Sequence, residues 1–433
     1  MSFELTTLGE IALGSNGAVD GPFGSNLKAS SYTESGIPVI RGSNLSLGLD
    51  EFKSDEFVYV GDDTYSRLAR SECLPQDIIF TKKGTLGQTG FVPQEPYPSY
   101  LISSNQMRLR VDPAKANPKY VYYWVSSKKA IDKIRGESEH TGVPKINLDY
   151  LKKFPISLPS VSYQNSAVEI LDNLNDKIAL NTQTSQTLEE MAQAIFKSWF
   201  VDFDPVKAKM NGEQPDGMDA ATASLFPDKL VESELGSIPE GWSASSMGEH
   251  FNITMGQSPK GETYNEEGEG IAFFQGRRDF GFRYPDVRVY TTDPKRFAKA
   301  GDTLISVRAP VGDKNMAAID CCIGRGVAAI KHKSDSRSFT YAFMSHIEKK
   351  LGDSGSSGTV FSSINQKELK KVSFVAPPQE LIEAFHKIVD PIDQKVEVLS
   401  KEIESLSSLR DTLLPKLLSG EIELDVEKVN AND

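Results

Sequence analysis

The stretch AVEILDNLNDKIALNTQTSQTLEEMAQAIFKSW, residues 167–199, decides the architecture of this chain. Apolar or small side chains recur along it at steps of four and three residues, and Asn181 and Ser185 are the polar exceptions. A mean spacing of 3.5 residues allows two helices to wind around each other. The stretch FHKIVDPIDQKVEVLSKEIESLSSLRDTLLPKL, residues 385–417, repeats the pattern 218 positions later. We therefore predict two long helices with matching seams, in which the two polar residues fix the register.

The apolar seams are interrupted by proline only in the second stretch. Asp390-Pro391 places a capping residue and a first-turn proline inside the seam, which predicts a break or a kink there. Pro415 predicts a disturbed last turn. The residues predicted for the two seams are Leu171, Leu174, Ile178, Leu188, Ile195 and Trp199, and Val389, Ile392, Val396, Leu399, Ile403, Leu406, Leu413 and Leu417.

The duplication extends upstream of both helices. Ile146-Asn147 recurs as Ile364-Asn365 at the same offset, and GIPVIRG at 36–42 recurs as GIAFFQG at 270–276 after the offset has drifted. Short apolar runs between Gly, Pro, Ser and Asn clusters predict a strand-rich globular unit in each copy, and residues 118–134 are predicted as one helix. The fold class is therefore α+β, with two tandem-duplicated domains separated by two long helices that form a coiled coil. The predicted segments are a first domain at 1–160, a central helix at 161–203, a linker at 204–240, a second domain at 241–376, a distal helix at 377–420 and a tail at 421–433.

The composition is that of an ordinary globular protein, with 39% hydrophobic and 25% charged residues among 433. No apolar run has the length of a membrane span, and the N-terminus lacks the pattern of a signal peptide. The three cysteines form no CxxC pair and suit a reducing compartment. We therefore expect a cytoplasmic protein without a membrane partner.

The net charge of −12 is unevenly distributed. Residues 1–160 hold 18 basic and 18 acidic residues, and residues 241–376 hold 19 basic and 15 acidic ones. The excess acid therefore lies in the helices, the linker and the tail. This distribution leaves the globular units free to meet phosphate, while acidic helices face protein partners.

Motifs for catalysis are missing. The sequence has no phosphate-binding loop, no HExxH motif, no Cys/His cluster with metal spacing, and no methyltransferase fingerprint. Pro285-Asp286 with Asp293-Pro294-Lys295 faintly resembles a PD-(D/E)xK nuclease, but Pro294 interrupts the strand that such a motif needs. We predict no catalytic residue, no metal site and no cofactor on this chain.

Polar and basic side chains recur in the loops at equivalent places of both copies, which favours DNA binding. Arg suits guanine edges, Asn and Gln suit adenine, and Lys and Ser/Thr suit phosphates. Asn147 and Asn365 have an equally good explanation as helix caps. The candidates are Arg41, Ser43, Asn44, Lys82, Lys83, Thr85, Asn105, Gln106, His140, Thr141, Lys145 and Asn147 in the first copy, and Gln275, Arg277, Arg278, Arg308, Arg325, Ser356, Ser357, Thr359 and Asn365 in the second.

Four phrases together resemble the specificity subunit of type I restriction–modification enzymes. They are PKINLDYLKKFPISLP at 144–159 with the following Gln164, IFKSWFVDFDPVKAKM at 195–210, SELGSIPEGW at 233–242 and PKLLSGEI at 415–422. The resemblance implies that each globular unit is a target-recognition domain for one half of a split, asymmetric double-stranded DNA sequence. It also implies that the long helices pair antiparallel and set the spacing of the two domains.

The same resemblance implies partners. Two methyltransferase subunits bind near the helices, and motor-nuclease subunits can join them. S-adenosylmethionine, ATP and magnesium belong to those partners. Three alternatives stay open at this point: a stand-alone nuclease built on the 285–295 carboxylates, a specificity subunit of a related fused type II system, and a scaffold whose globular units bind protein.

Overall fold

The computed structural model describes residues 3–48, 52–54, 56–138, 143–353 and 363–424. The chain forms two compact units. Unit 1 contains residues 1–177 and 406–433, and unit 2 contains residues 178–405. Two long helices, α5 (Val161–Phe200) and α11 (Gln379–Ser419), each contribute one part to unit 1 and the other part to unit 2.

Unit 1 is built on two sheets and a strand pair. The first sheet has the order β2-β10-β7-β8 and is antiparallel throughout, whereas the second, β3-β5-β4-β9-β6, contains one parallel pair, β4 with β9. Strand β1 (Glu4–Thr7) pairs with β11 (Pro155–Leu158) just before α5 begins. The other strands are β2 (Ala18–Asp20), β3 (Tyr32–Thr33), β4 (Ile37–Ile40), β5 (Val58–Val60), β6 (Glu72–Cys73), β7 (Ile78–Thr81), β8 (Thr89–Phe91), β9 (Tyr100–Ile102) and β10 (Gln106–Leu109).

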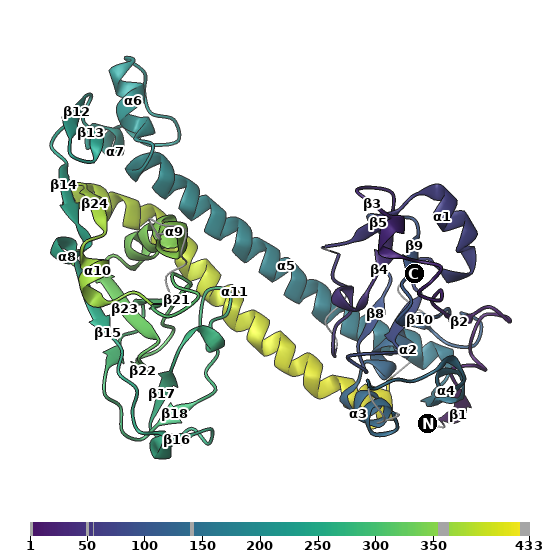
Figure 1. Cartoon of the computed structure of the whole chain (residues 1–433). Helices are drawn as coiled ribbons and strands as arrows, with labels where there is room; N and C mark the ends of the chain where they lie inside the picture. The colour runs from purple at the N-terminus through teal and green to yellow at the C-terminus, as the bar shows by residue number, and fades with distance from the viewer. Residues whose placement is uncertain (1–2, 49–51, 55, 139–142, 354–362, 425–433) are drawn as a thin grey trace. The chain divides into compact units, whose positions relative to one another are not determined.

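Unit 2 repeats this topology strand for strand. Its sheets have the orders β15-β23-β20-β21 and β16-β18-β17-β22-β19, again with a single parallel pair, β17 with β22 (Figure 1). The pair β14 with β24 takes the place of β1 with β11. The strands are β14 (Ser243–Ser246), β15 (Phe251–Met255), β16 (Tyr264–Asn265), β17 (Ile271–Phe274), β18 (Tyr290–Thr291), β19 (Phe297–Ala298), β20 (Thr303–Ser306), β21 (Lys314–Met316), β22 (Cys321–Ile323), β23 (Val327–His332) and β24 (Ser373–Ala376).

The shorter helices cover the sheets and connect them. The single helix predicted at 118–134 is two helices, because the Ser127 hydroxyl accepts from the Ala130 amide and starts a new N-terminus. The predicted linker is ordered and contains α6, α7 and the hairpin β12–β13. The elements are α1 (Asp62–Arg67), α2 (Pro118–Val125), α3 (Lys128–Gly136), α4 (Leu148–Lys153), α6 (Asp204–Met210), α7 (Ala220–Ser224), β12 (Leu230–Ser233), β13 (Gly236–Pro239), α8 (Met247–His250), α9 (Arg337–Asp353), α10 (Gln366–Lys370) and the 3-10 turns Ala29–Ser31, Gly42–Asn44, Ala69–Ser71, Gly261–Thr263 and Arg277–Asp279.

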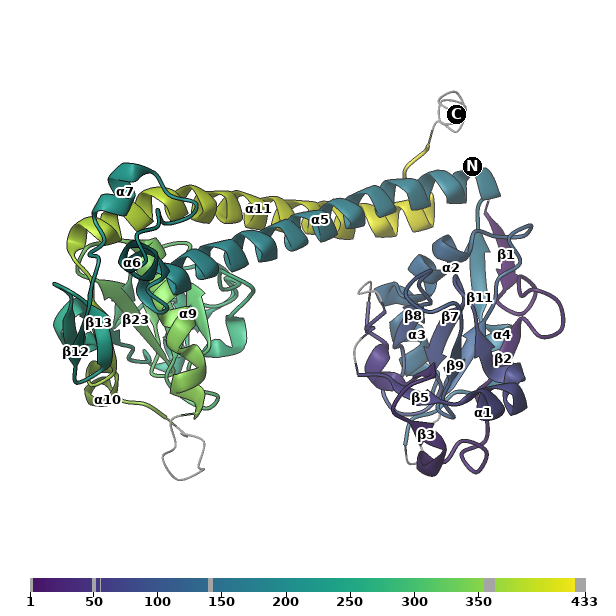
Figure 2. The ribbon, with the colours of Figure 1, turned by 90° about the horizontal axis from the view of Figure 1, so that it is seen from above.

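Helices α5 and α11 run side by side and antiparallel (Figures 1 and 2). In unit 1 the beginning of α5 meets the end of α11, where the Tyr163 hydroxyl donates to the Leu417 carbonyl at 3.1 Å. In unit 2 the end of α5 meets the beginning of α11, where the rings of Trp199 and Phe385 lie 6.1 Å apart. Asn181 and Ser185 are buried in the seam, as a register-fixing role requires. Of the predicted apolar seam residues, Leu171, Trp199, Val389, Val396, Leu399 and Leu417 are buried, and Leu174, Ile178, Leu188, Ile195, Ile392, Ile403, Leu406 and Leu413 are half-buried.

The predicted break at Asp390-Pro391 was wrong, because α11 continues through it, while the alternative of a kink stays a prediction. The same helix also continues through Pro415. Val389 and Asp393 are both buried against unit 2, and Arg337 binds the Asp390 carboxylate at 2.8 Å. Packing on both sides of the proline therefore outweighs the loss of one helical hydrogen bond. Within the described residues, no helix combines the length and the apolar character needed to cross a membrane.

Candidate nucleic-acid interface

A polar hollow of about 530 Å³ lies in unit 1 where β4 and β7 end and β10 begins. Four separate stretches of the sequence meet there, and neighbouring strand ends bring three of them together. Six of the candidate DNA contacts line it, and no carboxylate appears among its described lining residues. These six are Arg41, Ser43, Lys83, Thr85, Asn105 and Gln106.

The turn after β4 explains why Asn44 is not among them. Its side chain is fully buried, accepts from the Arg41 amide at 2.9 Å and donates to the Lys53 carbonyl at 3.1 Å. The prediction of Asn44 as a DNA contact is therefore corrected, since this side chain builds the turn that presents Arg41. Gln106 is also buried, with a hydrogen bond from the Ser103 hydroxyl, and it forms the floor of the hollow rather than an exposed edge.

The two lysines after β7 differ in what they can bind. Lys82 forms an ion pair with Asp20 at 3.0 Å, which neutralises it. Lys83 is exposed and forms a β-bridge with Lys145, so the segment before α4 lies beside the hollow. The Ile146 amide donates to the Lys82 carbonyl at 2.9 Å and fixes this arrangement. Two basic side chains thus flank the same edge.

Unit 2 carries a hollow of about 260 Å³ at the equivalent place, after β17 and β20 and before β23. Its candidate residues are mostly arginines, and no carboxylate appears among its described lining residues. The Ile364 amide donates to the Val307 carbonyl at 3.0 Å, which matches the bond from Ile146 to Lys82 in unit 1. Arg308 forms a β-bridge with Ser363, which matches the β-bridge between Lys83 and Lys145. The candidates that line this hollow are Gln275, Arg277, Arg308 and Arg325.

The remaining candidates lie elsewhere. Arg278 is exposed beside the unit 2 hollow without lining it. Asn147 and Asn365 are helix caps: the Asn147 side chain accepts from the Tyr150 amide at 2.8 Å, and Asn365 accepts from the Lys367 amide at 2.9 Å. Capping accounts for both asparagines without DNA. The candidates His140, Thr141, Ser356, Ser357 and Thr359 lie outside the described residues.

The nuclease alternative is not favoured. Lys295 lies in an ion pair with its neighbour Asp293 at 2.7 Å, so it is not available for a scissile phosphate. No group of three or more His, Cys, Asp or Glu that could hold a metal ion occurs in the described part of the chain.

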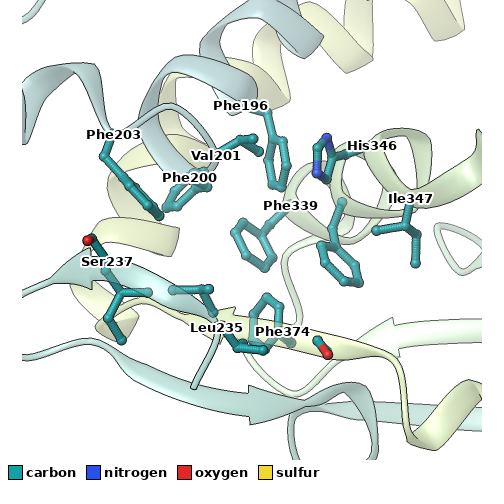
Figure 3. Close-up of a pocket in the computed structure, with 14 residues that line it drawn as sticks. Phe196, Phe200, Val201, Phe203, Leu235, Ser237, Phe339, His346, Ile347 and Phe374 are labelled. Atoms are coloured by element: carbon teal, nitrogen blue, oxygen red, sulfur yellow. The ribbon is translucent and has the colours of Figure 1, made fainter. Parts of the chain in front are cut away.

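A different kind of hollow lies at the end of α5 in unit 2. It has a volume of about 320 Å³, and Figure 3 shows the rings of Phe196, Phe200, Phe339 and Phe374 gathered around it. His346 is the only titratable side chain among its described lining residues. An aromatic lining of this kind fits an apolar side chain and offers nothing to a phosphate. The sequence signal was the aromatic phrase at 195–203, which was used only as a mark of resemblance.

Sequence reasoning also missed the residues that attach each globular domain to the helices. In unit 1 Lys119 pairs with Asp172 at 3.0 Å, and in unit 2 Arg337 pairs with Asp390 at 2.8 Å. Both members of the second pair lie 218 positions after those of the first. A search for oppositely charged residues retained at the duplication offset would have found this pair.

Comparison with known proteins gives one family. The family model for the type I restriction modification DNA specificity domain matches residues 31–190 and 239–408. The putative type I restriction enzyme MjaX specificity subunit of Methanocaldococcus jannaschii is 31% identical, over 84% of this chain and 83% of the relative. The type I restriction enzyme HindI specificity subunit of Haemophilus influenzae is 27% identical, over 75% and 82%. A crystal structure of the type I restriction–modification S subunit from M. genitalium covers 96% of both chains with a TM-score of 0.56 and 16% identity, which shows a common fold.

Proposed function

The chain belongs to the type I restriction–modification DNA specificity family, and from this premise we propose that each of its units reads one half of a split, asymmetric DNA target. The observation that carries the proposal is the pair of hollows at equivalent places in the two copies. Each is lined by basic and amide side chains and by no carboxylate among its described residues. Such a lining suits phosphates and base edges.

The two hollows differ in chemistry, which supports an asymmetric target. Unit 1 offers Lys83 and Asn105 beside Arg41, whereas unit 2 offers Arg308 and Arg325. Arg277 also lines the hollow of unit 2, but it forms an ion pair with Asp313. Arginine binds the O6 and N7 atoms of guanine with two hydrogen bonds, whereas lysine mainly meets phosphate as a point charge. We expect the half-site of unit 2 to contain at least one G·C pair that is read in the major groove.

The helices are proposed to dock methyltransferase subunits, one for each copy of the duplication. Two exposed apolar residues on each helix support this role. Each residue of α5 has its counterpart in α11 at the duplication offset of 218. Leu180 is 57% exposed and its counterpart Val398 is 56% exposed, while Met191 and its counterpart Leu409 are 50% and 47% exposed. Residues eleven apart lie three turns apart on nearly the same helix face. A solvated helix face gains nothing from such residues, whereas a partner that binds in two copies would bury both pairs.

The subunit itself is proposed to do no chemistry. S-adenosylmethionine, ATP and magnesium are then bound by the methyltransferase and motor-nuclease partners. This division of labour agrees with the missing catalytic motifs in the sequence.

Long-read sequencing of host DNA for methylated adenine, with and without this gene, tests the function directly. We expect a split motif that disappears when the gene is deleted. Complementation with N105A should change the tolerated sequence of one half only, and complementation with R308A should change the other half only. A motif that survives the deletion, or that changes in both halves with either variant, would contradict the proposal.

The spacer role has its own test. Seven residues inserted at matching levels of α5 and α11 lengthen the pair by two turns, about 10 Å, and keep the seam in register. We expect the gap between half-sites to grow while both half-sites stay the same. An unchanged gap would show that the helices do not set the spacing.

A further inference from the structure

The segment that joins β17 to β18 in unit 2 carries one arginine that points away from the hollow. Arg283 is 2% exposed and forms ion pairs with Glu189 of α5 and with Asp393 of α11. The centre of its guanidinium lies 3.6 Å from the centroid of the Tyr341 ring. One side chain of the recognition domain therefore binds both long helices at once.

Arg283 stays charged despite its burial. Burial by itself lowers the pKa of Arg283, but Tyr341, Glu189 and Asp393 outweigh that effect, and the net pKa is raised. A buried ion pair contributes little net stability compared with an apolar replacement of the same shape, although breaking it by removing one member is costly. The planar fork of a guanidinium fixes the direction of two carboxylates at once, so the gain lies in geometry.

The segment around Arg283 is tied to unit 2 by its backbone. The Gly281 amide donates to the Asn315 side chain at 3.0 Å, and Asn315 donates back to the Gly281 carbonyl at 2.9 Å. The Met316 amide donates to the Arg283 carbonyl at 2.8 Å. The turn Arg277–Asp279 belongs to the same segment, because the Asp286 amide donates to the Asp279 carbonyl at 2.8 Å. A shift of Arg283 would thus move Arg277, which lines the hollow.

Unit 1 has the same polar site, connected differently. Tyr123 and Asn175 stand 218 positions before Tyr341 and Asp393. The Tyr123 hydroxyl donates to Asp172 at 2.6 Å and accepts from the Asn175 amide group at 3.0 Å. Asn175 in turn accepts from Arg410 at 3.2 Å, so here the guanidinium comes from helix α11. In unit 2 an aspartate replaces the asparagine, and the guanidinium comes from the recognition domain.

We propose that Arg283 is a positioning residue for target recognition by unit 2, which holds the segment 277–286 in a fixed place on the helix pair so that its arginines meet one half-site. This inference rests on the proposed function, since it assumes that unit 2 reads a half-site. It assigns Arg283 no contact with DNA.

The test uses the complex reconstituted with methyltransferase subunits. The main variant is the triple substitution R283M/E189Q/D393N, which removes all three charges together and avoids a buried unpaired carboxylate. Methylation rates are measured on duplexes that carry a single mismatch in either half of the target. We expect discrimination to fall about tenfold in the half read by unit 2 and to stay unchanged in the other half, with a Tm close to that of the parent.

Two further variants complete the test. R283K keeps the charge but loses the fork, so we expect an intermediate loss in the same half. K401M removes an exposed ion pair with Glu397 on α11, 2.7 Å long, and is the matched control without an effect on either half. If the triple variant and R283K both discriminate like the parent in both halves, Arg283 is only structural and the proposal is wrong. A parent complex that shows no split target would instead contradict the proposed function.

Discussion

Unit 1 and unit 2 share one strand order, a single parallel strand pair in the five-stranded sheet and one arrangement of the loop before the last short helix, yet their charged residues differ at two places. The hollow of unit 1 is lined by one lysine, one arginine and several amides, whereas that of unit 2 is lined by three arginines and one amide. The polar site on the helices receives an arginine from α11 in unit 1 and from the recognition domain in unit 2. Duplication has thus kept the backbone frame and the basic–acidic pair that joins domain to helix, while the residues that line the two hollows have diverged.

The largest effect is expected from the hollows. R308A/R325A should lower the affinity of the methyltransferase complex for its cognate duplex by about 10²–10³-fold, because each arginine contact to a base or a phosphate contributes about 1–3 kcal/mol. K83A should have a smaller effect, about tenfold, and should reduce the slope of log K against log salt by about one. Titrations at several salt concentrations measure both quantities. Equal losses from the two variants would remove the chemical contrast between the units.

Removing the ion pair that joins a domain to the helices should have a smaller effect than the substitutions in the hollows. D390A removes one of the two carboxylates that pair with the half-buried Arg337 and leaves the other, Glu397. D172A removes the ion pair of Lys119 and the acceptor of the Tyr123 hydroxyl. We expect each substitution to destabilise its own unit by about 1–2 kcal/mol. Proteolysis with mass spectrometry should locate the weakened unit. Cleavage in the opposite unit would break the correspondence between the two pairs.

A substitution in the helix seam should raise the stability of the protein, whereas the preceding substitutions lower it. Asn181 is buried and its amide nitrogen has no hydrogen-bond partner in the described residues, whereas its counterpart Leu399 is apolar and buried. N181L should therefore stabilise the helix pair by about 1 kcal/mol, measured as a rise in Tm. The same change should loosen the register, since a polar seam residue specifies pairing at a cost in stability. Disulfide trapping between α5 and α11 would detect the slipped register, and a single trapped register would assign no such role to Asn181.

The smallest expected difference between the units is in how the stability of each unit depends on pH. Burial, together with the nearby His250 and Lys333, lowers the pKa of His332 from 6.5 to about 4. At the matching position of the sheet unit 1 has the buried Val111. Because the unfolded chain binds the proton more tightly, the stability of unit 2 is fully present above pH 6.5 and decreases as the pH falls toward 4. In thermal unfolding between pH 7 and pH 4, the stability of H332V should depend less on pH than that of the parent. If the two proteins show the same pH dependence, groups other than His332 cause it.

Several candidate residues show where sequence reasoning reaches its limit. Lys83, Arg308 and Arg325 were found because basic residues recurred in equivalent loops, and exposure on a loop follows directly from such a pattern. Asn44 and Gln106 were chosen by the same reasoning, as polar residues in equivalent loops. Asn44 instead holds the turn after β4 together, and Gln106 forms the buried floor of the hollow. Asn147 and Asn365 serve as caps. Residue type names the bonds that a side chain can make, and only the backbone around it decides whether the protein itself takes them.

The sequence by itself determined the duplication, the α+β class and the paired helices, because each depends on periodicity or on an offset that can be counted along the chain. It also determined the family, through four short phrases that are read directly from the residues. The tertiary structure alone decided that α11 continues through Pro391, that the six candidates of unit 1 share one hollow, and that Arg283 binds both long helices. Each of these outcomes depends on contacts between residues that are far apart in the sequence. A local pattern carries no information about the partner that will bury a proline's neighbours or neutralise an arginine.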